Sequence, residues 1–129
     1  MAKARVFLVD DSADIRRGVA RLFHVHPRFE VVGEAEHGLE AVEKAPNIRP
    51  DLIVLDLSMP VMNGFEAAKM LRKSLPNAWI ILLTAHEFPE VQRLLRESGI
   101  HAVVPKSQAS THLIPQAESL VYSASSNAS

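Results

Sequence analysis

The chain has 129 residues, of which 47% are hydrophobic and 22% are charged, and its formal net charge at pH 7 is −1. These values are typical of one soluble globular domain and disfavour a nucleic-acid-binding or membrane-binding surface. The sequence contains no cysteine, which excludes disulfides and thiolate metal sites and fits a reducing cytoplasm, where we expect the protein to act. No apolar run approaches the ~20 residues that span a bilayer, and the acidic start does not resemble a signal peptide.

Five short apolar runs alternate with longer amphipathic stretches along the chain. Most are rich in Val, Ile or Leu and lack strict polar alternation, which is typical of strands buried on both faces of a parallel sheet. The predicted strands are Arg5–Val9, Phe29–Gly33, Leu52–Leu55, Trp79–Thr84 and His101–Val104.

The stretches between these runs have apolar residues at helical spacing. Ser12 is a suitable N-cap for the first helix, and Pro46 is expected to end the second. Pro89 suits the first turn of the fourth helix, Gly99 its end, and Pro115 is expected to give the fifth a late or irregular first turn. The predicted helices run from Ser12 to about His24, Gly38 to Ala45, Gly64 to Ser74, Pro89 to Gly99 and Thr111 to about Ser123.

Alternating strands and helices predict right-handed βαβ units and an α/β fold with a parallel sheet between two layers of helices. We expect residues 1–123 to form one domain. The last residues, 124–129, are small and polar and are expected to form a flexible tail.

Polar or ionisable residues stand at the ends of four of the five predicted strands. Asp10 and Asp11 follow the first strand, and Asp56 follows the third. Thr84 closes the fourth strand, and Lys106 follows the fifth. In open parallel sheets the functional site forms beyond the carboxyl ends of the strands, so we expect these side chains to meet in one crevice.

Three carboxylates in one crevice repel one another, so the pKa of at least one must rise unless a cation is present. Mg²⁺, which takes carboxylates, water and phosphate oxygens as ligands, would remove the conflict. Lys106 adds a second positive charge and Thr84 a hydroxyl, a combination that suits a phosphoryl group. Asp56 stands alone after its strand and is the best candidate for an aspartyl nucleophile, which leaves Asp10 and Asp11 to hold the metal.

Five segments of the sequence resemble the motifs of response-regulator receiver domains, in the order and spacing of that family. They are Val9-Asp10-Asp11-Ser12, Val54-Leu55-Asp56-Leu57-Ser58-Met59-Pro60, Met62-Asn63-Gly64, Leu83-Thr84-Ala85 and Pro105-Lys106-Ser107. The resemblance covers residues 5–122. It implies a flavodoxin-like sheet with strand order 2-1-3-4-5 and a role in two-component signal transduction.

The resemblance also implies the partners. A sensor histidine kinase or phosphotransfer protein would donate a phosphoryl group to Asp56, and Thr84 and Lys106 would bind that group. Phosphorylation would shift the population of two conformers and control a downstream protein at the face formed by the fourth helix, fifth strand and fifth helix, or promote a dimer. The domain would catalyse only its own phosphorylation and dephosphorylation and would not bind nucleic acid directly.

For the metal, the resemblance implies Mg²⁺ bound by Asp11, Asp56 and the backbone carbonyl of Ser58. Asp10 would support the ion through water.

The sequence departs from the family pattern at one position. Val103 stands three residues before Lys106, where the family usually has Tyr, Phe or His. His101 is two residues earlier and is not the matching position. We therefore expect signalling to depend more on Thr84 and on the loop before the fourth helix. His86 and Ser58 are expected to tune hydrolysis of the phosphoryl group.

Four alternatives remain open. A haloacid-dehalogenase-type phosphatase would need Asp-x-Asp followed by Thr, whereas this chain has Asp10-Asp11-Ser12-Ala13. A nucleotide-binding module would need a glycine loop after the first strand, where two aspartates stand. A pure interaction domain would not need the complete set of site residues.

The last alternative is a piece of a longer transcription regulator. The segment Val32-Gly33-Glu34-Ala35 and the pair Lys106-Ser107 are similar to receivers that precede LuxR-type helix-turn-helix domains. Only a short tail follows the predicted fifth helix, so we do not expect a DNA-binding domain in this chain.

Overall fold

Five parallel strands form one sheet in the order β2-β1-β3-β4-β5 in the computed structural model, which describes residues 2–85, 95 and 97–123. This confirms the predicted fold class and strand order. Most of the predicted fourth helix, His86 and the predicted tail lie outside the described residues. The strands are β1 (Ala4–Val9), β2 (Phe29–Ala35), β3 (Leu52–Asp56), β4 (Trp79–Thr84) and β5 (Ala102–Pro105).

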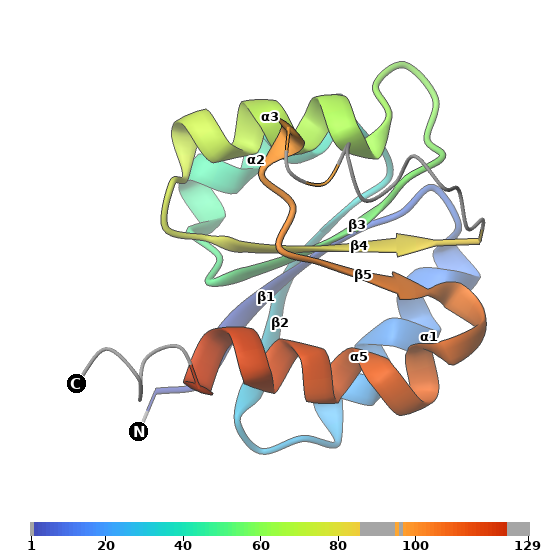
Figure 1. Cartoon of the computed structure of the whole chain (residues 1–129), viewed down its shortest axis with the longest axis vertical. Coiled ribbons are helices and arrows are strands. Elements are labelled where there is room, and N and C mark those ends of the chain that lie inside the picture. The colour runs from blue at the N-terminus through green and yellow to red at the C-terminus, as the bar shows by residue number, and fades with distance from the viewer. Residues whose placement is uncertain (1, 86–94, 96, 124–129) are drawn as a thin grey trace.

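Helices cover both faces of the sheet. Figure 1 shows α2 and α3 on one face and α1 and α5 on the other. A short 3₁₀ turn, η1, leads into α5, and a π-helical turn, η2, follows it. The bounds are α1 (Ala13–His24), α2 (Gly38–Ile48), α3 (Gly64–Ser74), η1 (Lys106–Gln108), α5 (Ala109–Glu118) and η2 (Ser119–Ser123).

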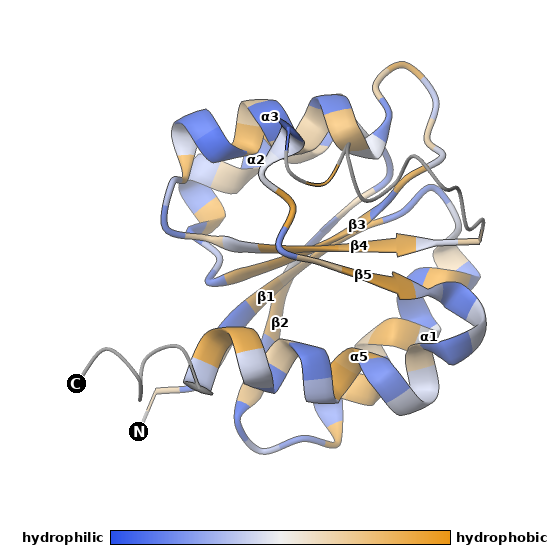
Figure 2. Ribbon diagram, in the orientation of Figure 1, coloured by the Kyte–Doolittle hydropathy of each residue, from blue (hydrophilic) through white to orange (hydrophobic). Residues whose placement is uncertain are grey.

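Each face of the sheet buries its own apolar cluster. Phe7 and Ile53 belong to the cluster on the side of α2 and α3, whereas Val6 and Leu52 belong to the cluster on the side of α1 and α5. Figure 2 shows the strands as mostly hydrophobic along their length. Because successive side chains point to opposite faces and both faces are covered, the strands have no polar side, as their sequences predicted.

Side-chain caps fix where α1, α2 and α3 begin, and those of α1 and α3 bear on the site. The Ile15 backbone N–H donates to Ser12 Oγ at 3.3 Å, which confirms Ser12 as the N-cap of α1. Asn63 caps α3 in the same way, and the Glu66 side chain bonds back to the Asn63 backbone to complete a capping box. These caps fix where the loops after β1 and β3 end and the following helices begin.

The predicted end of α2 at Ala45 is wrong, because the helix includes Pro46 and continues to Ile48. Ile48 packs on the core, and the Arg49 backbone N–H donates to the Ala45 carbonyl at 2.9 Å. The Arg5 guanidinium donates to the Ile48 carbonyl at 2.6 Å and so satisfies one of the last carbonyls of the helix. Tertiary contacts therefore keep the last turn helical although Pro46 supplies no backbone donor.

The last helix begins earlier than predicted. α5 starts at Ala109, because η1 leads into it, and Pro115 lies inside it. A proline at that position removes the bond to the Thr111 carbonyl but leaves the first turn intact. At its far end the chain is held by Tyr122, whose hydroxyl donates to the Arg28 carbonyl at 2.5 Å.

Within the described part of the chain, no helix has the length and apolar character that a membrane span requires.

Candidate functional site

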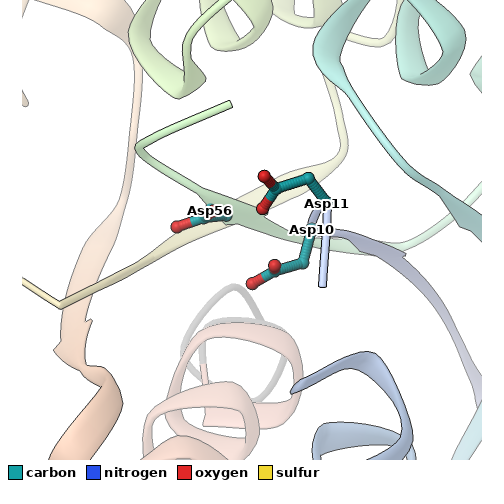
Figure 3. A group of neighbouring side chains, drawn as sticks. All are labelled: Asp10, Asp11 and Asp56. Atoms are coloured by element: carbon teal, nitrogen blue, oxygen red, sulfur yellow. The ribbon is translucent and has the colours of Figure 1, made fainter. Parts of the chain in front are cut away.

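Three aspartates meet at the carboxyl edge of the sheet. Asp10 follows β1, Asp56 ends β3, and each of these two residues is only 4% exposed, whereas Asp11 is exposed. One carboxylate oxygen from each of the three lies within 4.8 Å of the others. Figure 3 shows the three carboxylates gathered at this edge. The topology thus brings together the acidic side chains that the sequence placed after separate strands.

Lys106 completes the acidic cluster from the start of η1. Its Nζ lies 3.1 Å from Asp10 Oδ2 and 3.1 Å from Asp56 Oδ1, and its side chain is 22% exposed. One ammonium group therefore bridges two buried carboxylates, as expected from its position after β5.

Thr84 ends β4 at the same edge and is buried, at 2% exposure. In the sheet it pairs with Pro105, the residue before Lys106, and Asp56 pairs with Leu83, the residue before Thr84. The register therefore places Thr84 between the strand that carries Asp56 and the strand that leads to Lys106.

A close approach between β3 and α3 depends on Gly64. A Cβ added there would lie 2.6 Å from the Asp56 carbonyl oxygen and 3.0 Å from the Leu57 Cα. The Gly64 backbone N–H donates to the Leu57 carbonyl at 2.9 Å. The loop that follows Asp56 closes tightly for this reason.

The same loop contains a strained residue. Val61 has a φ of 70°, in the region that favours glycine, and the Met62 backbone N–H donates to the Pro60 carbonyl at 2.7 Å. A three-residue turn of this kind with positive φ is rare and costs energy in a β-branched residue. The Val61 side chain is 82% exposed, so the strain is not offset by its burial.

The charges in the cluster shift the pKa values of two groups. Burial, together with the charge of Asp10, raises the pKa of Asp56, although Lys106 and the Ser58 backbone N–H act in the opposite direction. Burial lowers the pKa of Lys106, but its contacts with Asp56 and Asp10 outweigh this and the net pKa is raised. Lys106 therefore stays protonated, while Asp56 is harder to ionise than an exposed aspartate.

The donor set fits a hard divalent cation. Asp10 Oδ2 is buried, and its close partner among the described residues is the Lys106 ammonium at 3.1 Å, which it shares with Asp56. One ammonium shared by two buried carboxylates leaves the three-aspartate cluster with excess negative charge, for which a further cationic partner would compensate. With two more carboxylates within reach, an ion that prefers oxygen ligands would supply that partner.

Arg16 is a residue at this site that the sequence motifs did not indicate. It lies on α1, donates from Nη1 to the Asp10 carbonyl at 2.5 Å and pairs through Nε with Glu34 Oε1 at 3.0 Å. The signal that could have found it is an arginine one turn into the helix that follows the acidic loop.

His101 and Val103 lie away from the acidic cluster. His101 immediately precedes β5, where its Nδ1 accepts from the Ile80 backbone N–H at 3.0 Å and its ring packs against Trp79. Val103 is partly buried and packs on the core beside α2 and α3. The position three residues before Lys106 therefore carries no aromatic ring, since Val103 occupies it.

Comparison with known proteins agrees with this geometry. The family model described as "Response regulator receiver domain" matches residues 6–118. The response regulator protein VraR of Staphylococcus saprophyticus is 36% identical over 110 residues, which cover 84% of this chain and 52% of that protein. Protein-glutamate methylesterase/protein-glutamine glutaminase 1 of Carboxydothermus hydrogenoformans is 41% identical over 108 residues, which cover 82% of this chain and 32% of that protein. The chain thus spans about half, or about a third, of the length of these relatives.

Two solved structures are similar over most of their length. The response regulator domain of Thermotoga maritima CheB has a TM-score of 0.81 and 31% identity, with 88% of this chain and 92% of that chain covered. A two-component response regulator of the LuxR family from Aurantimonas sp. SI85-9A1 has a TM-score of 0.87 and 32% identity, with coverage of 93% and 86%.

Proposed function

Because the chain belongs to the receiver-domain family of two-component response regulators, we propose that Asp56 accepts a phosphoryl group from a sensor histidine kinase or phosphotransfer protein. The observation that supports this most directly is the position of Asp56. It is a buried carboxylate at the end of β3, 3.1 Å from the Lys106 ammonium and grouped with two more aspartates. A nucleophilic carboxylate beside fixed positive charge suits transfer of an anionic phosphoryl group.

The proposed chemistry gives each side chain of the cluster one role. An Asp56 carboxylate oxygen attacks phosphorus, the bond from phosphorus to the donor imidazole nitrogen breaks, and that nitrogen takes up a proton. Lys106 favours the ionised form of Asp56 and offsets charge on the phosphoryl oxygens. Thr84 binds a phosphoryl oxygen through its hydroxyl. The domain acts as a phosphoacceptor and catalyses only its own phosphorylation and dephosphorylation.

The proposed cofactor is Mg²⁺. Its ligands would be Asp11, Asp56 and the backbone carbonyl of Ser58, and Asp10 would support it through water. When bound, the ion supplies the positive charge that three neighbouring carboxylates and an incoming phosphoryl group require. The support for this assignment is the group of three carboxylate oxygens within 4.8 Å of one another, with one ammonium to offset their charge.

The proposed docking site for the phosphoryl donor lies between α1 and α5. A surface cavity of about 280 Å³ there is lined by Ile15, Gly18 and Leu22 of α1 and by Lys106 and Ala109 on the other side. A Cβ added at Gly18 would meet nothing within 4 Å, so this stretch of α1 leaves room for a partner beside Lys106. A partner seated there would lie beside Lys106, whose ammonium contacts Asp56.

The proposed output is a change in protein–protein contact. Phosphorylation shifts the population of two conformers, and the target binds at the face formed by the fourth helix, β5 and α5, with a dimer as one outcome. Val103 has no ring to move, so Thr84 and the loop expected before the predicted fourth helix carry more of the change than an aromatic residue does.

Acetyl phosphate and Mg²⁺ give a direct test. We expect intact-mass measurement to show one phosphoryl group per chain, lost in Asp56→Asn. Asp51→Asn is the matched control, because Asp51 is exposed, lies at the other end of β3 and keeps an acceptor for the Arg5 backbone N–H. Equal labelling of Asp56→Asn would mean that the acceptor is another residue. Repeated turnover of an aryl phosphate would favour a phosphatase.

The docking site needs a separate test. Gly18→Glu should slow transfer from a phosphorylated histidine-containing protein while leaving the rate with acetyl phosphate unchanged. If both donors are slowed equally, the substitution disturbs the phosphorylation site itself and the docking assignment is wrong.

A further inference from the structure

Arg16 is held between the acidic loop and β2. Its side chain is only 13% exposed, and the guanidinium bonds at once to the Asp10 carbonyl, at 2.5 Å, and to Glu34 Oε1, at 3.0 Å. An arginine can satisfy two acceptors with a planar, rigid fork. The Arg16 side of this contact is largely removed from water, whereas the Glu34 side chain is 48% exposed, so the bond to the part-buried Asp10 carbonyl is the better shielded of the two.

Every other polar group of Asp10 already has a contact. Its backbone N–H donates to the Ala35 carbonyl at 3.1 Å, Oδ1 accepts from the Ser12 N–H at 2.9 Å, and Oδ2 faces Lys106. The carbonyl that Arg16 binds belongs to the same rigid peptide plane as the N–H of Asp11. Arg16 therefore fixes the direction in which Asp11 leaves β1.

Asp11 depends on this backbone direction more than Asp10 or Asp56 does. It is exposed, whereas the other two aspartates are buried in the strand ends. Its carboxylate can lie within 4.8 Å of the other two only if the loop backbone points it toward Asp56.

The backbone of Glu34 is held by a further set of contacts. Its backbone carbonyl accepts from Lys44 Nζ at 3.3 Å, Lys44 pairs with Glu40 Oε2 at 3.4 Å, and Glu40 Oε1 accepts from the Glu36 N–H at 2.6 Å. These charges join α1, β2 and α2 around a surface cavity of about 230 Å³. Glu34, the partner of Arg16, therefore belongs to a set of polar contacts that links α1, β2 and α2.

We infer that Arg16, oriented by Glu34, is a positioning residue for the metal site: it sets the Asp10–Asp11 peptide so that the Asp11 carboxylate faces Asp56. The inference rests on the proposed function only in that the acidic cluster binds a divalent cation. Groups that orient the ligands of a metal typically change its affinity by about 10- to 100-fold when removed.

Calorimetric titration of the intact chain with Mg²⁺ alone tests the inference. Arg16→Gln should weaken Mg²⁺ binding by about tenfold, and Glu34→Gln should weaken it less but in the same direction. Arg17→Gln is the matched control, because Arg17 is the next residue and carries the same charge but pairs with Asp14 on the exposed surface of α1. That control should change the affinity by less than about twofold.

Two further measurements separate positioning from charge and from folding. Arg16→Lys keeps the charge but lacks the planar fork, so it should recover only part of the affinity. In labelling with acetyl phosphate, Arg16→Gln should raise the Mg²⁺ concentration needed for the half-maximal rate while the rate at saturating Mg²⁺ stays near that of the unmodified chain. A variant that had lost its structure would not recover at high Mg²⁺.

The inference is overturned if Arg16→Gln binds Mg²⁺ as tightly as the unmodified chain, if Arg17→Gln weakens binding equally, or if Arg16→Lys restores full affinity. If Arg16→Gln does not fold, Glu34→Gln decides, and unchanged Mg²⁺ affinity in that variant overturns the inference. A chain that binds Mg²⁺ with this Arg16 dependence but never labels Asp56 would refute the proposed function and leave the inference standing.

Discussion

The Lys106 ammonium lies 3.1 Å from a carboxylate oxygen of Asp56 and equally far from one of Asp10, so one partly exposed cation compensates two buried anions. Removal of the ammonium leaves two buried carboxylates without a compensating charge. Removal of either carboxylate relieves the repulsion between the two. The stability of the domain should respond to these two changes in opposite directions.

Lys106→Met should lower the free energy of unfolding by roughly 1–3 kcal/mol without Mg²⁺, because an uncompensated buried charge is costly. Added Mg²⁺ should restore part of the loss. Urea denaturation with and without the ion measures both effects. Lys69→Met is the control, since Lys69 is an exposed residue of α3, and it should have little effect. A loss of equal size in both variants would mean that the ion pair does not stabilise the fold.

Asp56→Asn should stabilise the metal-free domain at neutral pH. The pKa of Asp56 is raised in the folded state, so the folded chain binds a proton more tightly than the unfolded chain does. The free energy of unfolding therefore falls as pH rises from the ordinary aspartate pKa of 3.8 through the raised value, and the loss persists above it. The advantage of the asparagine variant should vanish at the acid end of this window. Thermal melts over a pH series would show it, and equal melting temperatures at neutral pH would contradict it.

Val61→Gly should stabilise the domain by about 0.5–1 kcal/mol, because glycine adopts the positive φ of 70° without the cost that valine has. Val25→Gly is the matched control. Val25 is as exposed as Val61, but it has a φ of −80° at the end of α1, so the added chain entropy of glycine should destabilise the domain by a similar amount. If Val61→Gly destabilises the domain as Val25→Gly does, Val61 is not strained.

His101, which lies at the opposite end of the sheet from the acidic cluster, should make the stability of the domain depend on pH. Burial and the nearby charge of Arg72 lower the pKa of His101, and its Nδ1 must be unprotonated to accept from the Ile80 N–H. The folded chain thus binds fewer protons than the unfolded chain, so the free energy of unfolding falls as pH drops from 6.5 through the lowered pKa. His101→Gln should flatten this slope. A slope that persists in the variant would belong to another group.

The fluorescence of Trp79 should follow the protonation of His101 and not the binding of Mg²⁺. The two rings are 4.7 Å apart, whereas Trp79 and Thr84 stand at opposite ends of β4. Five residues of strand correspond to roughly 16 Å. An acid titration should therefore quench Trp79, and addition of Mg²⁺ at neutral pH should not. Strong quenching by Mg²⁺ would contradict the proposed location of the metal.

The parts of the fold that the sequence predicted share one physical cause. A strand buried on both faces reads as an uninterrupted apolar run, and parallel strands end at the same edge, so the meeting of Asp10, Asp56, Thr84 and Lys106 follows from the order of the elements alone.

The parts that the sequence did not predict depend on contacts between distant segments. α2 continues past Pro46 because Ile48 reaches the core and because Arg5 of β1 donates to the carbonyls at the end of the helix. The target of Arg16 was equally hidden, since a long flexible side chain has no fixed direction until β2 places Glu34 beside it. Local sequence carries no information on either partner.

The contacts of Tyr122 make the described chain close to a ring. Its hydroxyl donates to the Arg28 carbonyl and accepts from the Ala4 backbone N–H at 3.3 Å, so the end of η2 lies against the start of β1, and Figure 1 shows the two ends side by side. A short linker from Tyr122 back to Ala4 would therefore permit circular permutation. New termini between Pro76 and Asn77, exposed residues before β4, would lie at the opposite end of that strand from Thr84. Permutation there would leave the acidic cluster untouched and make its assembly independent of the native chain order.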